Sequence, residues 1–247
     1  MTAKLYAVPG SHPCATAERA LELKGIPYRR IDLVPVFHKV AQKARFGGAG
    51  TVPGLVLDDG AKVHGSRAIL RELDRRRPEP RLLPADPDER AWVEEIEAWG
   101  DELLQPLVRR VLWWALSREP SAQLSFAEGT RLVPPVPAPL ARLSGAPVAW
   151  FERRFNDSRA PEVRADLANL PAHLDRIDGW LAGGRLGGEA PTAADLQVAP
   201  SVRLLQTMDD LAPLIAGRPC DAWARGLFPH YPGRVPAGAL PAEWLPR

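Results

Sequence analysis

The first 80 residues alternate between short apolar runs and amphipathic stretches, and this alternation restricts the start of the chain to an α/β unit. The strand and helix patterns alternate as β, α, β, α, β, β, α over residues 4–8, 13–24, 28–34, 37–46, 54–57, 61–64 and 66–78. Gly25 and Pro78 end two of the predicted helices, and Asp59-Gly60 between two apolar runs is typical of a hairpin. We therefore expect a small mixed sheet with helices packed against it.

The order of these elements predicts where a ligand binds. A right-handed crossover makes the first two strands parallel, and a hairpin paired beside strand one adds an antiparallel and then a parallel strand. Three loops then meet at one edge, namely residues 11–14, 51–53 and 65–67. Two of them begin helices, whose free N–H groups and positive dipole ends favour an anion.

The remainder of the chain is predicted to be helical. Four prolines between Arg77 and residue 87 indicate a linker, and apolar residues from Trp92 to Leu107 and from Val163 to Leu181 recur at intervals of three or four. Thr192 with Asp195 predicts a capping box at the start of a helix. Residues 132–139 contain four prolines and are predicted to form a loop. The expected organisation is residues 1–80 as the α/β domain, 81–87 as linker, 88–228 as an all-helical domain and 229–247 as a proline-rich tail.

Composition and charge exclude several classes of protein. The chain is 45% hydrophobic and 25% charged, as in ordinary globular proteins, and has no apolar run of about 18 residues or signal peptide. Residues 1–80 carry 14 basic against 8 acidic residues and the rest 18 against 22, without the dense basic clusters of a nucleic-acid surface. Cys14 and Cys220 lack the spacing of a zinc site, and His12 and His64 have no clear third ligand. We expect a cytoplasmic protein without a metal and without a nucleic-acid or membrane partner.

Several motifs, in their order and spacing, resemble those of the cytosolic glutathione S-transferases. The similarity covers Lys4 to about Leu116 well and the remainder loosely. The matching segments are Leu5-Tyr6, Gly10-Ser11-His12-Pro13, residues 20–28, Thr51-Val52-Pro53, Ser66-Arg67-Ala68-Ile69 and Pro191 to Asp195.

The resemblance implies both a fold and an activity. The fold is a thioredoxin-like βαβαββα domain followed by an all-α domain. The activity is transfer of glutathione, or another low-molecular-weight thiol, to an electrophilic apolar substrate, as in detoxification, by a homodimer.

The resemblance also implies the thiol-binding residues. A cis peptide before Pro53 would turn the N–H and C=O groups of Val52 toward an extended peptide-like ligand. Ser66, as a helix N-cap, would bind the γ-glutamyl carboxylate. A basic residue after the second strand, His38 or Lys39, would bind the terminal carboxylate of the ligand. The expected thiol site comprises His12, His38, Lys39, Val52, Pro53, Gly65, Ser66 and Arg67.

Gly65 departs from the family pattern. The family usually has Glu or Gln here, to meet the γ-glutamyl group, so glycine removes a polar partner. Either the protein binds a thiol other than glutathione, or an acid from the helical domain, such as Asp101, takes the place of the missing polar side chain.

Two residues compete for the catalytic role. Ser11 matches the serine-type catalytic position of the family, where a hydroxyl donates to the bound thiol and favours its thiolate. Cys14 lies in the first turn of a helix, where a thiol pKa falls, and would instead form mixed disulfides as a thiol oxidoreductase. A buried structural Cys14 is the simpler interpretation.

The substrate pocket is expected on the first long helix of the helical domain. Arg109, Arg110, Trp113 and Trp114 lie where this helix faces the crevice in the family. Adjacent tryptophans on a helix point in different directions, so at least one belongs to the core or to a dimer interface.

A third hypothesis, kept open by Gly65, is a non-catalytic binding or scaffold protein with the same fold.

Overall fold

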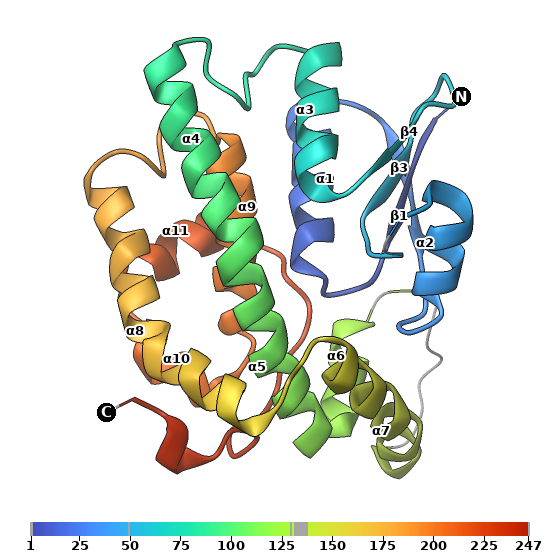
Figure 1. Cartoon of the computed structure of the whole chain (residues 1–247), viewed down its shortest axis with the longest axis vertical. Helices are drawn as coiled ribbons and strands as arrows, with labels where there is room; N and C mark the ends of the chain where they lie inside the picture. The colour runs from blue at the N-terminus through green and yellow to red at the C-terminus, as the bar shows by residue number, and fades with distance from the viewer. Residues whose placement is uncertain (1, 49, 129, 131–137, 247) are drawn as a thin grey trace.

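The computed structural model describes residues 2–48, 50–128, 130 and 138–246, with the side chains of residues 138–144 left out. A four-stranded sheet forms the centre of the N-terminal domain (Figure 1). Its strands are β1 (Ala3–Ala7), β2 (Tyr28–Asp32), β3 (Gly54–Val56) and β4 (Lys62–His64). The strand order is β2-β1-β3-β4.

The strand directions are those that the element order predicts. Leu5 in β1 faces Arg30 of the parallel strand β2 and Leu55 of the antiparallel strand β3. Strand β4 pairs antiparallel with β3, with Leu55 opposite Val63. The thioredoxin-like βαβαββα order expected from the sequence is therefore confirmed.

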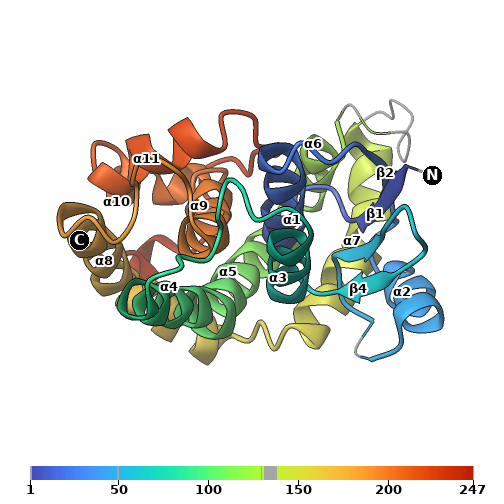
Figure 2. The ribbon, with the colours of Figure 1, turned by 90° about the horizontal axis from the view of Figure 1, so that it is seen from above.

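Three helices cover this sheet. They are α1 (His12–Leu23), α2 (His38–Phe46) and α3 (Ser66–Arg76). Helices α1 and α3 lie between the sheet and the helical domain, whereas α2 lies on the opposite face (Figure 2). The fully buried side chains include Leu5, Leu21, Leu55, Ile69, Leu70 and Leu73. This apolar layer holds the N-terminus of α1 at the carboxyl end of β1.

The second part of the described chain is helical, as the sequence predicts. Its helices are α4 (Pro87–Trp99), α5 (Gln105–Arg118), α6 (Gln123–Phe126), α7 (Ala138–Phe155), α8 (Ala160–Ala182), α9 (Ala193–Leu205), α10 (Ala212–Ile215) and α11 (Pro219–Leu227). Short turns of other helical types lie at η1 (Gly100–Leu104), η2 (Pro120–Ala122), η3 (Asp209–Leu211) and η4 (Ala242–Trp244). Residues 132–137 of the predicted loop lie outside the described residues, and Ala138 and Pro139 begin α7.

The apolar stripe from Trp92 to Leu107 is not one continuous α-helix. A π-helical turn, η1, lies between α4 and α5, and Pro106 is the second residue of α5. Leu103 is partly exposed as a result of this shift in register. The backbone therefore stays helical from α4 through η1 into α5, and the proline lies directly after the π-helical turn.

Helix α9 is buried along its whole length and joins the two parts of the molecule. It packs against α1, α4 and α11. The capping box predicted at Thr192 and Asp195 is present, and the Thr16 hydroxyl on α1 donates to the Leu196 carbonyl at 2.7 Å. The α1 helix is thus fixed from the sheet on one side and from α9 on the other.

Candidate functional site

A cavity of about 370 Å³ opens at the carboxyl end of β1, between the N-terminal domain and helices α5, α6 and α7. Its wall is mainly apolar. The N-terminal domain contributes Val8 to Pro13, Val34, Pro35, His38, Lys39, Thr51 and Val52. The helical domain contributes Arg109, Leu112, Trp113, Leu116, Gln123, Leu124, Phe126, Ala127, Gly145, Val148, Glu152, Phe155, Asn156 and Leu204.

Ser11 lies at the mouth of this cavity, at the N-cap of α1. Ser11 lines the cavity, and its side chain makes no capping hydrogen bond but contacts the Cys14 thiol. The dipole of the 12-residue helix α1 places positive potential at the same point. A hydroxyl and a helix N-terminus together can stabilise a thiolate.

Cys14 lies one turn further along α1 and is 1% exposed. Burial raises the pKa of its thiol to about 12, against the lowering effect of its hydrogen bond with the Ser11 side chain. At neutral pH it is therefore a protonated thiol in the core, which counts against a nucleophilic role.

Both cysteines are expected to resist thiol reagents in the folded protein. Cys220 is also fully buried, and its pKa is likewise raised to about 12, mainly by burial. Titration with 5,5′-dithiobis(2-nitrobenzoate) at pH 7.5 should label neither cysteine until denaturant is added, and then both. Rapid labelling of one cysteine in the native protein, assigned to Cys14 by a Cys14→Ser variant, would restore the oxidoreductase hypothesis.

His12, from α1 of the N-terminal domain, and Arg109, from α5, both line the cavity. The Nδ1 atom of His12 is 3.1 Å from the Ser201 hydroxyl on α9, whereas its Nε2 atom is buried without a hydrogen-bond partner. Burial and the nearby Arg109 guanidinium hold the pKa of His12 well below its usual value. His12 is therefore neutral at pH 7 and cannot act there as a cationic ligand.

His38 and Lys39 begin α2, beyond the second strand, as expected, and both line the cavity. Burial, with Lys39 beside it, lowers the pKa of His38 to about 4, so this imidazole is neutral. The Lys39 ammonium forms an ion pair with Glu152 of α7 at 3.2 Å and lies 3.6 Å from the Phe155 ring centroid. Of the two residues, Lys39 is the cation that can meet a carboxylate.

The loop at Gly10 is held by residues that the sequence analysis did not single out. The Tyr231 hydroxyl donates to the Gly10 carbonyl at 3.0 Å, and a Cβ at Gly10 would lie 2.5 Å from the Phe126 ring. Phe126 is buried and lines the cavity. Tyr231 belongs to the proline-rich tail, so the tail helps to position the loop that carries Ser11.

Two of the four expected pocket residues on α5 lie elsewhere. Arg110 donates two hydrogen bonds to the Asp166 carboxylate, at 2.6 and 2.8 Å. Trp114 stacks on Trp244 and under the Arg153 guanidinium. Residues four apart share a helix face and adjacent residues do not, so Arg109 and Trp113 line the cavity, whereas Arg110 and Trp114 do not.

The expected ligand loop at residues 65–67 also lies outside the lining of this cavity. Gly65 is connected to the neighbouring loop because its N–H donates to the Pro53 carbonyl at 2.9 Å. The Val52-Pro53 peptide is cis, as expected, and Val52 lines the cavity whereas Pro53 does not. The cavity therefore unites two of the three predicted loops.

Ser66 is the first residue of α3 and not its N-cap. Gly65 occupies the cap position with a φ of 89°, in the left-handed region where glycine is favoured. Ser66 is 5% exposed. The sequence assigned the cap one residue late because serine is the more frequent capping residue.

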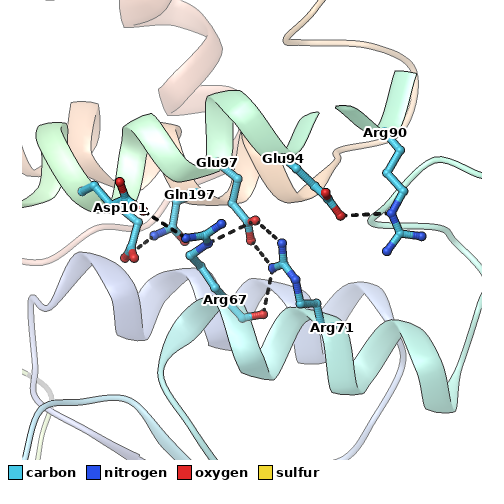
Figure 3. A network of polar contacts seen from close by, with 8 residues as sticks. Arg67, Arg71, Arg90, Glu94, Glu97, Asp101 and Gln197 are labelled. Atoms are coloured by element: carbon cyan, nitrogen blue, oxygen red, sulfur yellow. Dashed lines mark hydrogen bonds and ion pairs between the residues drawn. The ribbon is translucent and has the colours of Figure 1, made fainter. Parts of the chain in front are cut away.

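Arg67 faces α4 and belongs to a polar cluster between the two domains (Figure 3). The fully buried Glu97 carboxylate accepts from Arg67 at 3.3 Å and from both terminal nitrogens of Arg71, at 2.8 and 2.7 Å. Asp101 lies beside this cluster, accepts from Gln197 at 3.0 Å, and has a pKa raised by burial. Asp101, the acid that could replace the missing Glu or Gln side chain of the family, therefore lies near α3 but does not line the cavity.

Within the described residues, no group of three or more His, Cys, Asp or Glu could hold a metal ion. No helix in the same part of the chain is long and apolar enough to cross a membrane.

Comparisons with known proteins point to one family. Residues 5–81 match the family model described as the N-terminal domain of glutathione S-transferase. No curated protein matches the sequence.

Solved structures with the same fold cover nearly the whole chain. A glutathione S-transferase from Rhodospirillum rubrum is 23% identical, with a TM-score of 0.63, and the match covers 93% of this chain and 89% of that one. One from Sinorhizobium meliloti is 20% identical over 99% of both chains, also with a TM-score of 0.63. A glutathione S-transferase-I bound to lactoylglutathione is 20% identical, with a TM-score of 0.63, over 93% of this chain and 95% of that one.

Proposed function

We propose that this protein transfers a low-molecular-weight thiol to an electrophile, because residues 5–81 match the family model of the glutathione S-transferase N-terminal domain. Glutathione is the first candidate thiol, since one similar structure holds lactoylglutathione. The same proposal includes a cytoplasmic homodimer with the domain boundaries predicted from the sequence.

One observation carries the proposal. Ser11 places its hydroxyl at the N-terminus of α1, in contact with the Cys14 thiol and not with the helix backbone, in a cavity whose opposite wall is mainly apolar. If the sulfur of a bound thiol accepts a hydrogen bond from this hydroxyl, the sulfur lies in the cavity that both domains line. The apolar wall then takes the electrophile, and the two reactants are held side by side.

The chemistry follows from these positions. Donation from the Ser11 hydroxyl and the α1 dipole lower the pKa of the bound thiol, so more of it is thiolate at neutral pH. Val52 supplies backbone groups for a peptide-like ligand, and a ligand carboxylate would meet Lys39 beside the ion pair that Lys39 makes with Glu152. The thiolate attacks the electrophilic carbon, a C–S bond forms, and the leaving group departs with the bonding electron pair.

Calorimetric titration with glutathione tests the thiol site. Lys39→Met should weaken glutathione binding about 10-fold or more, because a charge-assisted hydrogen bond is lost. Lys43→Met is the matched control, since Lys43 lies one turn further along α2, is exposed and does not line the main cavity. Conjugation of 1-chloro-2,4-dinitrobenzene, followed by absorbance, tests the reaction.

The outcomes separate the alternatives. Binding of mycothiol in place of glutathione would change the thiol but keep the reaction type. Binding of a thiol without conjugation of any electrophile would favour the non-catalytic hypothesis. If no thiol binds, the transferase proposal is wrong.

A further inference from the structure

We infer that Arg109 binds the carboxylate of the electrophilic substrate, so the preferred electrophile is an aromatic or similarly apolar monocarboxylate. This inference rests on the proposed transferase function and specifies its second substrate. It comes from a cation in the cavity wall that the described residues leave without a partner.

Arg109 makes no hydrogen bond or ion pair with any residue that the structure describes, and its Nε atom is buried. Its neighbour Arg110, in contrast, is held by both oxygens of Asp166. The Arg109 side chain is partly buried, and the removal of water from around it lowers the pKa of the guanidinium. A cation held in this way without a partner destabilises a folded protein. An unpaired guanidinium in a cavity wall is suited to bind a planar anion, such as the carboxylate of a ligand.

The other charged groups around the cavity do not neutralise Arg109. Glu152 forms its ion pair with Lys39. Asp101 and Glu152 attract the Arg109 guanidinium through space without an ion pair to it. His12 and His38 are neutral at pH 7. The described lining therefore carries one uncompensated positive charge, which matches one carboxylate.

The residues that follow Arg109 on α5 define the rest of the ligand. Leu112, Trp113 and Leu116 lie three, four and seven positions further, on the same helix face, and all line the cavity. A carboxylate on Arg109 thus places the body of its molecule along an apolar wall. An aromatic ring can also pack on the Trp113 indole.

Arg109 and Lys39 come from different domains, although they line one cavity and burial together with the Arg109 charge lowers the pKa of Lys39. Lys39 follows β2 in the N-terminal domain, on the same side as Ser11 and Val52, and serves a carboxylate of the thiol. Arg109 belongs to the helical domain and leads the apolar stripe, so its anion is attached to the apolar reactant. The reaction needs no further reagent.

The matched probes are 4-chloro-3,5-dinitrobenzoate and its methyl ester. In both, the glutathione thiolate attacks the carbon that carries chlorine, the C–S bond forms, chloride leaves with the bonding electrons, and the thiol proton passes to solvent. The two probes differ in charge and not in the reacting atoms. We expect the parent protein to have the lower KM for the benzoate, roughly 10- to 100-fold below that for the ester.

The variants are Arg109→Met, Arg109→Lys and, as control, Arg118→Met, which removes an exposed arginine from the same helix. Arg109→Met should abolish the preference for the carboxylate and leave the KM for the ester nearly unchanged, and Arg109→Lys should retain part of the preference. The midpoint of thermal unfolding should not fall, because methionine removes an unpaired buried charge. Arg118→Met should match the parent protein.

Binding of unreactive 3,5-dinitrobenzoate, measured by calorimetry, gives a readout that does not depend on catalysis. Arg109-dependent binding without any conjugation would overturn the proposed function but support the anion site. Conjugation of the ester with no preference for the benzoate, or a preference unchanged in Arg109→Met, would overturn this inference and leave the transferase proposal standing. If Arg109→Met weakened the binding of glutathione but not that of the benzoate, Arg109 would be a ligand of the thiol. That result would also overturn this inference.

Discussion

Replacement of Ser11 by alanine is expected to raise the pKa of the bound thiol by about 1 to 2 units. A hydrogen bond to a charged group contributes about 1.5–3 kcal/mol, and 1.36 kcal/mol corresponds to one pKa unit. At pH 6.5 the value of kcat/KM should then fall roughly 10- to 100-fold, because less thiolate is present. The loss should shrink as the pH rises through the new pKa, since the thiol ionises without help there.

Ser11→Thr is the control for this prediction, since it keeps a hydroxyl at the N-cap of α1 and threonine also caps helices. It should retain most of the activity and the parental pH profile. The measurement is kcat/KM for 1-chloro-2,4-dinitrobenzene between pH 5.5 and 9, with thiolate absorbance near 240 nm as a direct check on ionisation. An unchanged profile midpoint in Ser11→Ala would show that Ser11 has no role in thiolate formation.

The fold could be predicted from the sequence because local signals and long-range packing agree in this chain. The hairpin at Asp59-Gly60 and the capping box at Thr192 are set by turn and cap chemistry over a few residues. Strand directions then follow from the handedness of one crossover. The position of the helical break at η1 was not predictable, since no residue pattern distinguishes a π-helical turn from a kink at Pro106.

The candidate site was only partly predictable. Helical phase alone separates Arg109 from Arg110, which is information that the spacing contains. Glu152 and Phe155 of α7, and Asn156 directly after it, are far in sequence from the lining residues of the N-terminal domain, and their contribution depends on how α7 packs against α5. Similarly, the neutral state of His38 arises from burial, which the sequence around residue 38 does not indicate.

Gly65 shows how a sequence argument can omit a backbone cause. In the comparison with the family it represents a lost polar side chain. In the structure its φ of 89° is a conformation that other residues avoid, although a Cβ there would meet nothing within 4 Å. The glycine is therefore required by the turn into α3, whichever thiol the cavity takes.

A large loss of stability is expected from replacing Lys24 with methionine. The Lys24 side chain is fully buried and its ammonium donates to Asp74 at 2.6 Å and to the carbonyls of Arg77, Pro78 and Pro80. It thus joins the end of α1 to the end of α3 and to the start of the linker. Removing one partner of a buried ion pair costs about 3–5 kcal/mol in free energy of unfolding, which lowers the unfolding midpoint of a chain of this size by roughly 6 to 20 °C.

The loss should come from the unpaired groups and not from the change in volume, because methionine is about as long as lysine. A double-mutant cycle with Asp74→Leu tests this, since removing both charges should cost less than the sum of the two single losses. Lys43→Met, an exposed lysine, should change the midpoint by less than about 2 °C, in line with the small effect of surface substitutions. An equally small effect of Lys24→Met would mean that the contacts of this ammonium contribute little to the junction between the domains. Thiol binding should be retained at low temperature in the variant, because Lys24 lies at the opposite end of α1 from Ser11.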